Sequence, residues 1–176
     1  MNQSKFAVNG VNFEIRQATS KDYQAVEKLM IDTATWLKKS GSTQWNDILD
    51  GTDVHQIRER IHQNEVFLLT QKEQTAGTMI VRKTPSAWDE NLWEEQATEP
   101  AFYIHRLMIA RPYKGLQLSA RMLQFAEELA ASARIPFIRL DTLASNNALN
   151  QLYAETFTFL NSKDGYSLYQ KKVQPS

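Results

Sequence analysis

The stretch YIHRLMIARPYKGLQLSARML, residues 103–123, decides how this chain folds. An apolar strand, predicted over residues 102–109, runs into a Lys114-Gly115 turn, and an amphipathic helix follows from Leu118. The first turn of a helix has four N–H groups without partners and the positive end of the macrodipole, so such a turn can bind an anion. Residues 114–119 are therefore either a strand-to-helix turn alone or a site for a phosphate-bearing ligand.

The composition is that of an ordinary globular chain. Of its 176 residues, 42% are hydrophobic and 23% are charged, and one domain over residues 1–176 is expected. The 20 basic and 20 acidic side chains cancel, which argues against nucleic acid as the main partner. The chain has no cysteine, and it has neither an apolar run of about 20 residues nor a signal peptide. We expect a cytoplasmic protein without disulfides and without a membrane partner.

Strand and helix patterns alternate along the rest of the chain. Alternating or β-rich segments predict strands at residues 13–18, 66–70, 75–83, 102–109, 136–142, 156–160 and 166–173. Helical spacing predicts a helix from Tyr23 to Leu37, a shorter one marked by Val54, Ile57 and Ile61, and two more from Leu118 and from Asn146 or Asn147. Residues 85–100, which are acidic and rich in tryptophan, read as a long solvated loop, with a helical turn within it as an alternative. This order predicts a mixed α/β sheet with helices on its faces.

A second motif lies downstream of the turn. Leu140-Asp141-Thr142 is followed by Asn146 and then by Tyr153. Seven residues are two helical turns, so a capping Asn146 and Tyr153 are expected on one face of the helix. A phenol can serve as an acid for a leaving group. In isolation, the same two residues also fit a helix cap and a core tyrosine.

The element order and the two motifs together resemble the GNAT superfamily of acyl-CoA-dependent N-acetyltransferases, over nearly the whole chain. The turn of that family reads Gln/Arg-x-x-Gly-x-Gly/Ala, and Lys114 to Ser119 occupy it. Gln117 stands where the family prefers glycine, and Ser119 stands where it prefers glycine or alanine. The resemblance implies an α/β fold whose twisted, largely antiparallel sheet has six to seven strands, helices on both faces and a splayed central parallel pair.

The resemblance also implies that acetyl-CoA is the cosubstrate and assigns residues to it. Asn146 would contact the pantetheine arm, and the Tyr153 hydroxyl would protonate the departing thiolate. The strand backbone would pair with the pantetheine at Leu107, Met108 and Ile109. The pyrophosphate would lie on the turn formed by Lys114, Gly115, Leu116, Gln117, Leu118 and Ser119.

His105 is the best candidate for a general base, because an alkylamine is mostly protonated at neutral pH and must lose a proton before it attacks. It alternates with Tyr103, Leu107 and Ile109, so these side chains are expected on one side of the sheet. A hydrogen-bonded structural histidine is the alternative. By the resemblance, Gln44 and Trp45 belong to the acceptor pocket. No metal site is expected, because no carboxylate completes one with His55 and His62.

These observations lead to one expected activity and two alternatives. The expected activity is transfer of an acetyl group from acetyl-CoA to an amine, on a small molecule or a peptide, by direct attack and without a covalent enzyme intermediate. Gln117 and the lack of a glycine after Tyr153 favour a weak or inactive acyl-CoA-binding module instead. The third reading is an interaction protein that forms a homodimer through a sheet edge or the tryptophan-rich segment, and it is compatible with the first.

Overall fold

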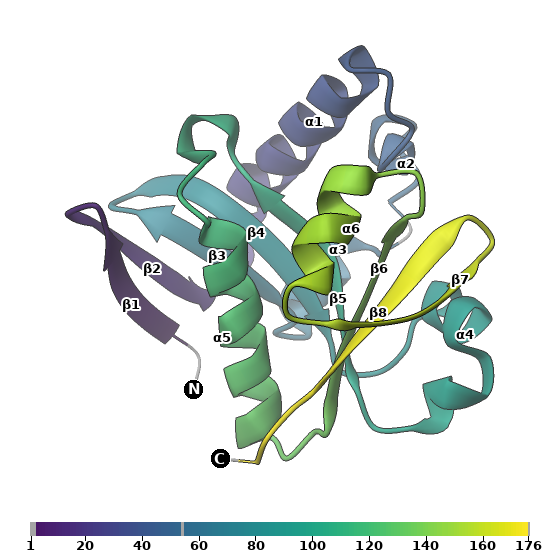
Figure 1. Ribbon diagram of the computed structural model, residues 1–176. Coiled ribbons are helices and arrows are strands. Elements are labelled where there is room, and N and C mark those ends of the chain that lie inside the picture. Colours follow the sequence, from purple (N-terminus) through teal and green to yellow (C-terminus); the bar gives the residue numbers. More distant parts are fainter. Residues whose placement is uncertain (1–2, 54, 176) are drawn as a thin grey trace. The chain divides into compact units, whose positions relative to one another are not determined.

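Eight strands and six α-helices follow one another along the residues that the computed structural model describes, 3–53 and 55–175 (Figure 1). The strands are β1 (Gln3–Val8), β2 (Val11–Gln17), β3 (Val66–Gln71), β4 (Gln74–Arg82), β5 (Phe102–Ile109), β6 (Phe137–Leu143), β7 (Thr158–Lys163) and β8 (Tyr166–Lys172). The helices are α1 (Tyr23–Lys39), α2 (Asn46–Leu49), α3 (Ile57–His62), α4 (Ala87–Trp93), α5 (Leu118–Ser132) and α6 (Asn147–Ala154). Val54, which helped to predict α3, lies outside the described residues.

The strands form one sheet in the order β1-β2-β3-β4-β5-β6-β8-β7. The sheet has eight strands, slightly more than the predicted six to seven, because β1 was missed. It forms a hairpin with β2 through Asn9-Gly10, whose φ angles are +52° and +78°. Asn-Gly is the dipeptide that a two-residue hairpin turn with positive φ favours, so the sequence carried this signal.

The predicted parallel pair is confirmed in a mixed α/β sheet. β5 and β6 run parallel, with Phe102 opposite Ile138 and Tyr103 opposite Arg139, at the beginning of both strands. Antiparallel pairing joins β1 to β2, β2 to β3, β3 to β4, β6 to β8 and β7 to β8. The predicted splay of the parallel pair stays a prediction.

The chain divides into two compact units, and β5 and α5 contribute to both. One unit contains the residues up to Val81 together with Arg106–Phe125, and the other contains Arg82–His105 together with the residues from Ala126 onward. The single domain expected for residues 1–176 stays a prediction. Within the described residues, no helix has both the length and the apolar character that crossing a membrane requires.

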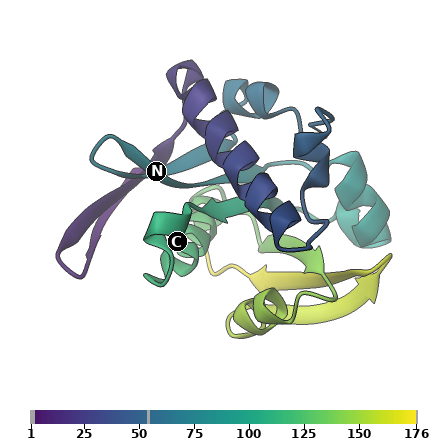
Figure 2. The ribbon, with the colours of Figure 1, turned by 90° about the horizontal axis from the view of Figure 1, so that it is seen from above.

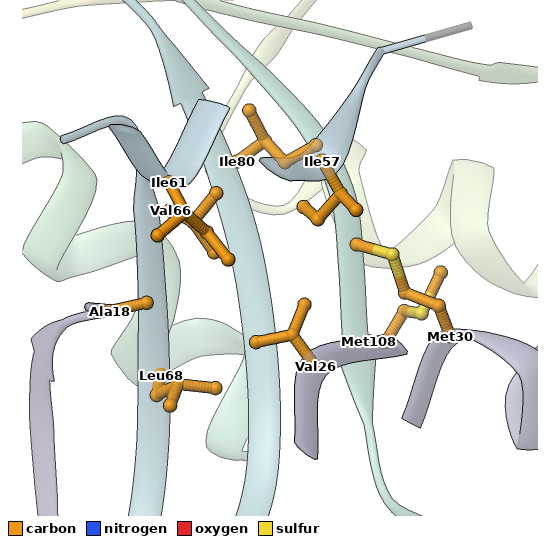
Figure 3. Close-up of a cluster of buried hydrophobic side chains, with 9 residues drawn as sticks. All are labelled: Ala18, Val26, Met30, Ile57, Ile61, Val66, Leu68, Ile80 and Met108. Carbon is orange, nitrogen blue, oxygen red and sulfur yellow. The ribbon is translucent and has the colours of Figure 1, made fainter. Parts of the chain in front are cut away.

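In the first unit, helices cover both faces of β3. On one face, side chains of α1 and α3 pack against the strands in the cluster of Figure 3, which consists of Ala18, Val26, Met30, Ile57, Ile61, Val66, Leu68, Ile80 and Met108. Phe67 alternates with Val66 and Leu68, and its ring meets Phe125 of α5 with 5.3 Å between the centroids. Alternate side chains of β3 thus pack into two hydrophobic cores, one on each face of the strand.

In the second unit, α4 and α6 lie on opposite sides of β7 and β8 (Figure 2). Leu168 of β8 packs in a cluster with Leu92 and Trp93 of α4, whereas the next residue, Tyr169, packs against Tyr153 of α6 at 5.9 Å between ring centroids. Because neighbouring residues of a strand point to opposite faces, β8 places α4 on one face and α6 on the other.

Candidate active site

Helix α4 positions the first group of the candidate site. Residues 85–100, expected to be a loop, form α4 and a 3-10 helix at Glu94–Thr98. Ser86 caps α4: the Asp89 N–H donates to Ser86 Oγ at 3.2 Å, and the Ser86 N–H donates to Asp89 Oδ2 at 2.9 Å. This Ser-x-x-Asp spacing is the signal that the sequence analysis overlooked. Its result is a carboxylate, fully buried, in the first turn of the helix.

His105 of β5 meets this carboxylate. The Nε2 atom of His105 lies 3.0 Å from Asp89 Oδ2 and 2.9 Å from Oδ1, and the histidine is 9% exposed. Burial alone would raise the pKa of Asp89, but the charge and hydrogen bond of His105, together with the Ser86 donors, hold it below its ordinary value. Because the ionised carboxylate only accepts hydrogen bonds, we assign a proton to Nε2 of His105, which donates it to Asp89.

Asp141 of β6 is the third member of this cluster. Asp89, His105 and Asp141 each offer an atom within 4.8 Å of the others. The Trp88 Nε1–H lies 3.3 Å from both oxygens of Asp141. Burial raises the pKa of Asp141, the charge of Asp89 raises it further, and the charge of His105 opposes the shift. Two carboxylates and an imidazole are also donors that metals accept, and the expected absence of a metal stays a prediction.

Sequence reasoning found one member of this cluster and missed two. His105 was singled out, whereas Asp89 was assigned to a solvated acidic loop and Asp141 was given no role. Tyr103 and His105 both contact α4, Tyr103 through Trp93 at 6.1 Å between ring centroids, so they share a side as expected. Arg106 has a φ of +54°, and this left-handed residue interrupts the alternation from which Leu107 and Ile109 were assigned to the side of His105.

Asn146 caps α6 as predicted, and Tyr153 lies one residue before the end of that helix. The Leu149 N–H donates to Asn146 Oδ1 at 3.1 Å. Tyr153 is 8% exposed and packs against Phe157 and Tyr169. Burial, with a further contribution from the charge of Asp141, raises the pKa of Tyr153 to about 12. The phenol is therefore protonated at every pH at which the folded protein is expected to work.

The turn at Lys114–Ser119 has the backbone that a glycine-rich turn would have. Gly115 has a φ of +85°, and Gln117 has a φ of +56° although it is not glycine. Gln117 and Lys114 are exposed, whereas Leu118 at the start of α5 is 2% exposed, so only its backbone is available to a ligand. The N–H groups at the start of α5 lack partners within the helix. The predicted turn therefore exists, and Gln117, which departs from the family pattern, has the backbone conformation that a glycine would have there.

Two cations next to this turn gather over Trp36 of α1. The Arg111 guanidinium carbon lies 3.9 Å from the centroid of the Trp36 ring, and Lys114 Nζ lies 5.6 Å from it. Stacking on an aromatic face holds a guanidinium in place while its N–H donors stay available at the ring edge. The arrangement increases positive charge beside Gly115.

The remaining predicted residues are in the first unit. Met108 is buried in the core of Figure 3, so it can offer a ligand mainly backbone groups, whereas Leu107 and Ile109 are half-buried. Trp45 has a φ of +62° and packs partly buried against the same core. The Gln44 N–H donates to Ser42 Oγ at 3.1 Å. The part of these residues in binding cofactor or acceptor stays a prediction.

Comparison with known proteins gives a consistent answer. Residues 26–159 match the family described as "Acetyltransferase (GNAT) family". The chain is 34% identical over 158 residues to the "Uncharacterized N-acetyltransferase YesJ" of Bacillus subtilis (strain 168), covering 89% of this chain and 88% of that protein. A GNAT-family acetyltransferase structure from Listeria monocytogenes is 48% identical, with a TM-score of 0.86 over 97% of this chain and all of that one.

A more distant structure shares the fold alone. PaiA N-acetyltransferase from Thermoplasma acidophilum, crystallised in complex with coenzyme A, is 13% identical. It superposes with a TM-score of 0.72 over 91% of this chain and 98% of its own. The architecture is therefore kept where most side chains differ.

Proposed function

Because the chain belongs to the acetyltransferase (GNAT) family, we propose that it transfers the acetyl group of acetyl-CoA to an amine by direct attack, with His105 as the general base and Tyr153 as the acid. The family uses acetyl-CoA as its cosubstrate, and the chain is an N-acetyltransferase by its family and its relatives. The observation that carries the assignment of roles is the buried His105–Asp89 pair.

The base has to remove a proton from an ammonium ion or from the attacking nitrogen. His105 accepts that proton, and the ring becomes an imidazolium whose charge Asp89 stabilises. The nitrogen lone pair then forms the C–N bond at the thioester carbonyl, and the C–S bond breaks with its electron pair leaving on sulfur. A buried carboxylate that already holds the ring suits this step, because it fixes the tautomer before the substrate arrives.

Tyr153 acts on the sulfur. A phenol whose pKa is raised to about 12 stays protonated, so it is always able to donate. It donates a hydrogen bond as negative charge develops on the departing thiolate, and its proton moves to the sulfur. The phenolate then regains a proton and the His105 imidazolium loses one, by exchange with solvent, which restores both residues. The products are the N-acetylated amine and coenzyme A, and no residue of the chain becomes acetylated.

The cofactor roles follow the same proposal, unit by unit. In the first unit, the N–H groups of the Lys114–Ser119 turn bind the pyrophosphate, helped by Arg111 and Lys114, and the backbone of Leu107–Ile109 pairs with the pantetheine. Gln44 and Trp45 line the acceptor side. In the second unit, Asn146 offers its amide to the pantetheine arm, since its Oδ1 is used by the helix cap.

The direct test is an assay of thiol release from acetyl-CoA with a panel of alkylamines, amino acids and peptides. Because the chain has no cysteine, a chromogenic thiol reagent detects the released coenzyme A without a background from the protein. We expect release that depends on the amine. Tight binding of acetyl-CoA in calorimetry, with no transfer to any amine of the panel, would instead establish the acyl-CoA-binding module.

Gln117→Gly tests the turn. We expect acetyl-CoA to bind within about twofold of its wild-type affinity, because glycine adopts the left-handed φ of residue 117 without strain and the backbone donors are unchanged. Gln117→Val is the matched opposite: a β-branched residue is strongly disfavoured at this φ, so binding should weaken roughly tenfold, about 1.4 kcal/mol. Calorimetry measures both. A marked loss with glycine would show that the glutamine side chain itself contacts the ligand.

A further inference from the structure

We infer that Arg106 and Asp47 are positioning residues for the acceptor: their buried ion pair ties α2 to β5, and so fixes the acceptor side relative to the strand that binds the cofactor. The inference rests on the proposed acetyl transfer and adds to it the residues that place one substrate against the other. It concerns the first unit alone, because both residues belong to that unit.

Helix α2 depends on contacts outside itself. It has four residues, whereas an isolated helix is only marginally stable even at about 12–15 residues. Its N-cap, Trp45, has a left-handed φ of +62° and makes no capping side-chain hydrogen bond. Trp45 and Ile48 pack partly buried against the cluster of Figure 3. These apolar contacts hold α2 on the core but specify its exact position weakly, because the hydrophobic effect has no direction.

Arg106 supplies a contact that does have a direction. Its side chain is 4% exposed, and its Nη2 atom donates a hydrogen bond to Asp47 Oδ2 of α2. A buried guanidinium is costly unless it is paired and hydrogen-bonded. The Nε–H of Arg106 is buried and has no acceptor within the described part of the chain, so the carboxylate of Asp47 is the group that offsets this cost.

Stability alone does not require this pair. Two apolar side chains could bury similar surface without removing charges from water, and such replacements are often neutral or stabilising. The backbone adds to the cost, because Arg106 has a left-handed φ of +54° inside a strand, a conformation that L-residues other than asparagine and aspartate seldom adopt. A costly arrangement that the fold could do without points to a function.

β5 is held in place independently of this pair. Just beyond the strand, the Ala110 N–H donates to Ala76 O at 2.8 Å. A Cβ atom on Gly77 of β4 would lie 2.8 Å from Met108 O, closer than such atoms approach, so the backbones of β4 and β5 are in tight contact there. Breaking the ion pair should therefore release α2 and leave β5 where it is.

The two ends of the pair serve different substrates under the proposed function. Asp47 follows Gln44 and Trp45, which line the acceptor side. Arg106 precedes Leu107, whose backbone pairs with the pantetheine together with that of the next two residues. A misplacement of about 1 Å between reactants can cost roughly 10²-fold in rate. Because only α2 is released, loss of the pair should weaken binding of the amine and spare that of acetyl-CoA.

Asp47→Asn tests the pair with little change of shape. At saturating acetyl-CoA, we expect KM for the best amine of the panel to rise roughly tenfold, while calorimetry shows acetyl-CoA bound within about twofold of its wild-type affinity. Glu65→Gln is the matched control, because it breaks another buried arginine pair of the same unit, Arg60 Nη1 to Glu65 Oε1 at 2.5 Å. Both variants should lower Tm by roughly 5–10 °C, but Glu65→Gln should leave KM for the amine within about twofold.

Arg106→Met combined with Asp47→Leu separates positioning from stability. The double variant removes both buried charges, so Tm should return to within about 3 °C of the wild type, whereas KM for the amine should stay raised. If the pair served the fold alone, KM would recover together with Tm. Recovery of the wild-type KM in the double variant, or an equal rise of KM in Glu65→Gln, overturns the inference.

Hydrogen exchange measures the anchoring of α2 without turnover. The N–H groups of Ile48, Asp50 and Thr52 are hydrogen-bonded to carbonyl groups within residues 45–52. We expect all three to exchange at least about tenfold faster in Asp47→Asn and in the double variant, and near the wild-type rate in Glu65→Gln. Unchanged exchange in Asp47→Asn overturns the inference.

The two readouts separate this inference from the proposed function. A wild type that transfers acetyl to no amine, with the exchange changes as expected, would contradict the proposed function and leave the anchoring of α2 in place. Acetyl transfer whose KM for the amine is unchanged in Asp47→Asn would contradict the inference and leave the proposed function in place.

Discussion

Replacing Tyr153 by phenylalanine should lower the rate of acetyl transfer by roughly 10²–10⁴-fold while acetyl-CoA binds within about twofold of its wild-type affinity. The change removes one hydroxyl from a buried ring whose packing against Phe157 and Tyr169 phenylalanine can keep. It therefore removes the donor to the sulfur and little else. Steady-state kinetics with the best amine of the panel, and calorimetry with acetyl-CoA, measure the two quantities.

Tyr169→Phe is the control for this change, because it removes the neighbouring hydroxyl from the same aromatic group. That hydroxyl donates to Asn150 Oδ1 at 2.7 Å, so its loss should cost about 1 kcal/mol of stability and leave the rate nearly unchanged. With a pKa near 12, Tyr153 should also produce no fall in rate below about pH 11. An unchanged rate in Tyr153→Phe would exclude it as the acid.

His105→Gln should produce a loss of similar size, roughly 10²–10⁴-fold in kcat, because glutamine can hydrogen-bond to Asp89 but cannot accept the proton of the amine. The loss should shrink when the amine is supplied at a pH high enough to make it neutral, since the base is then needed less. A structural histidine would show instead a loss of stability with the same fractional loss of rate at every pH.

Ser86→Ala is the matched control for the support of this histidine. It removes the two hydrogen bonds of the Ser86 hydroxyl, the one it accepts from the Asp89 N–H as the cap of α4 and the one it donates to Asp89 Oδ2, so it should cost about 1 kcal/mol of stability. It keeps the Ser86 N–H donor and the carboxylate beside His105. We expect kcat to stay within about threefold of the wild type, roughly 0.6 kcal/mol. A loss as large as that of His105→Gln would show that the cap, and not the imidazole, limits the rate.

Most of the fold could be predicted because its signals are local. The alternation of apolar and polar residues predicted β2, and helical spacing of apolar residues predicted α1 and α5. The capping residue Asn146 predicted the start of α6. β1 was missed although Asn9-Gly10 marks its turn, because its segment was considered only as a possible signal peptide and its side chains are at most half-buried. α4 was missed because acidic residues suggested solvent, whereas the Ser86 cap and the apolar Leu92 and Trp93 form a buried helix.

The candidate site was harder, because it depends on pairing between distant segments. Asp89, His105 and Asp141 come from a helix and two strands, and nothing in their spacing along the chain brings them together. Only the parallel register of β5 and β6 and the packing of α4 do so. At Gln117 the sequence misled in the other direction. A glutamine where the family prefers glycine suggested a different turn, yet its backbone adopts the conformation that glycine would have.

The double engagement of Asp89 constrains how this sequence can change over generations. One carboxylate closes the first turn of α4 and also holds the ring of His105, so a substitution at position 89 is selected against for folding and for chemistry at once. A substitution at position 86 affects the folding of α4 only. Substitutions should therefore accumulate at residue 86 long before they are accepted at residue 89. An engineer seeking a new acceptor would have more freedom at Trp88, which lies between them in the sequence.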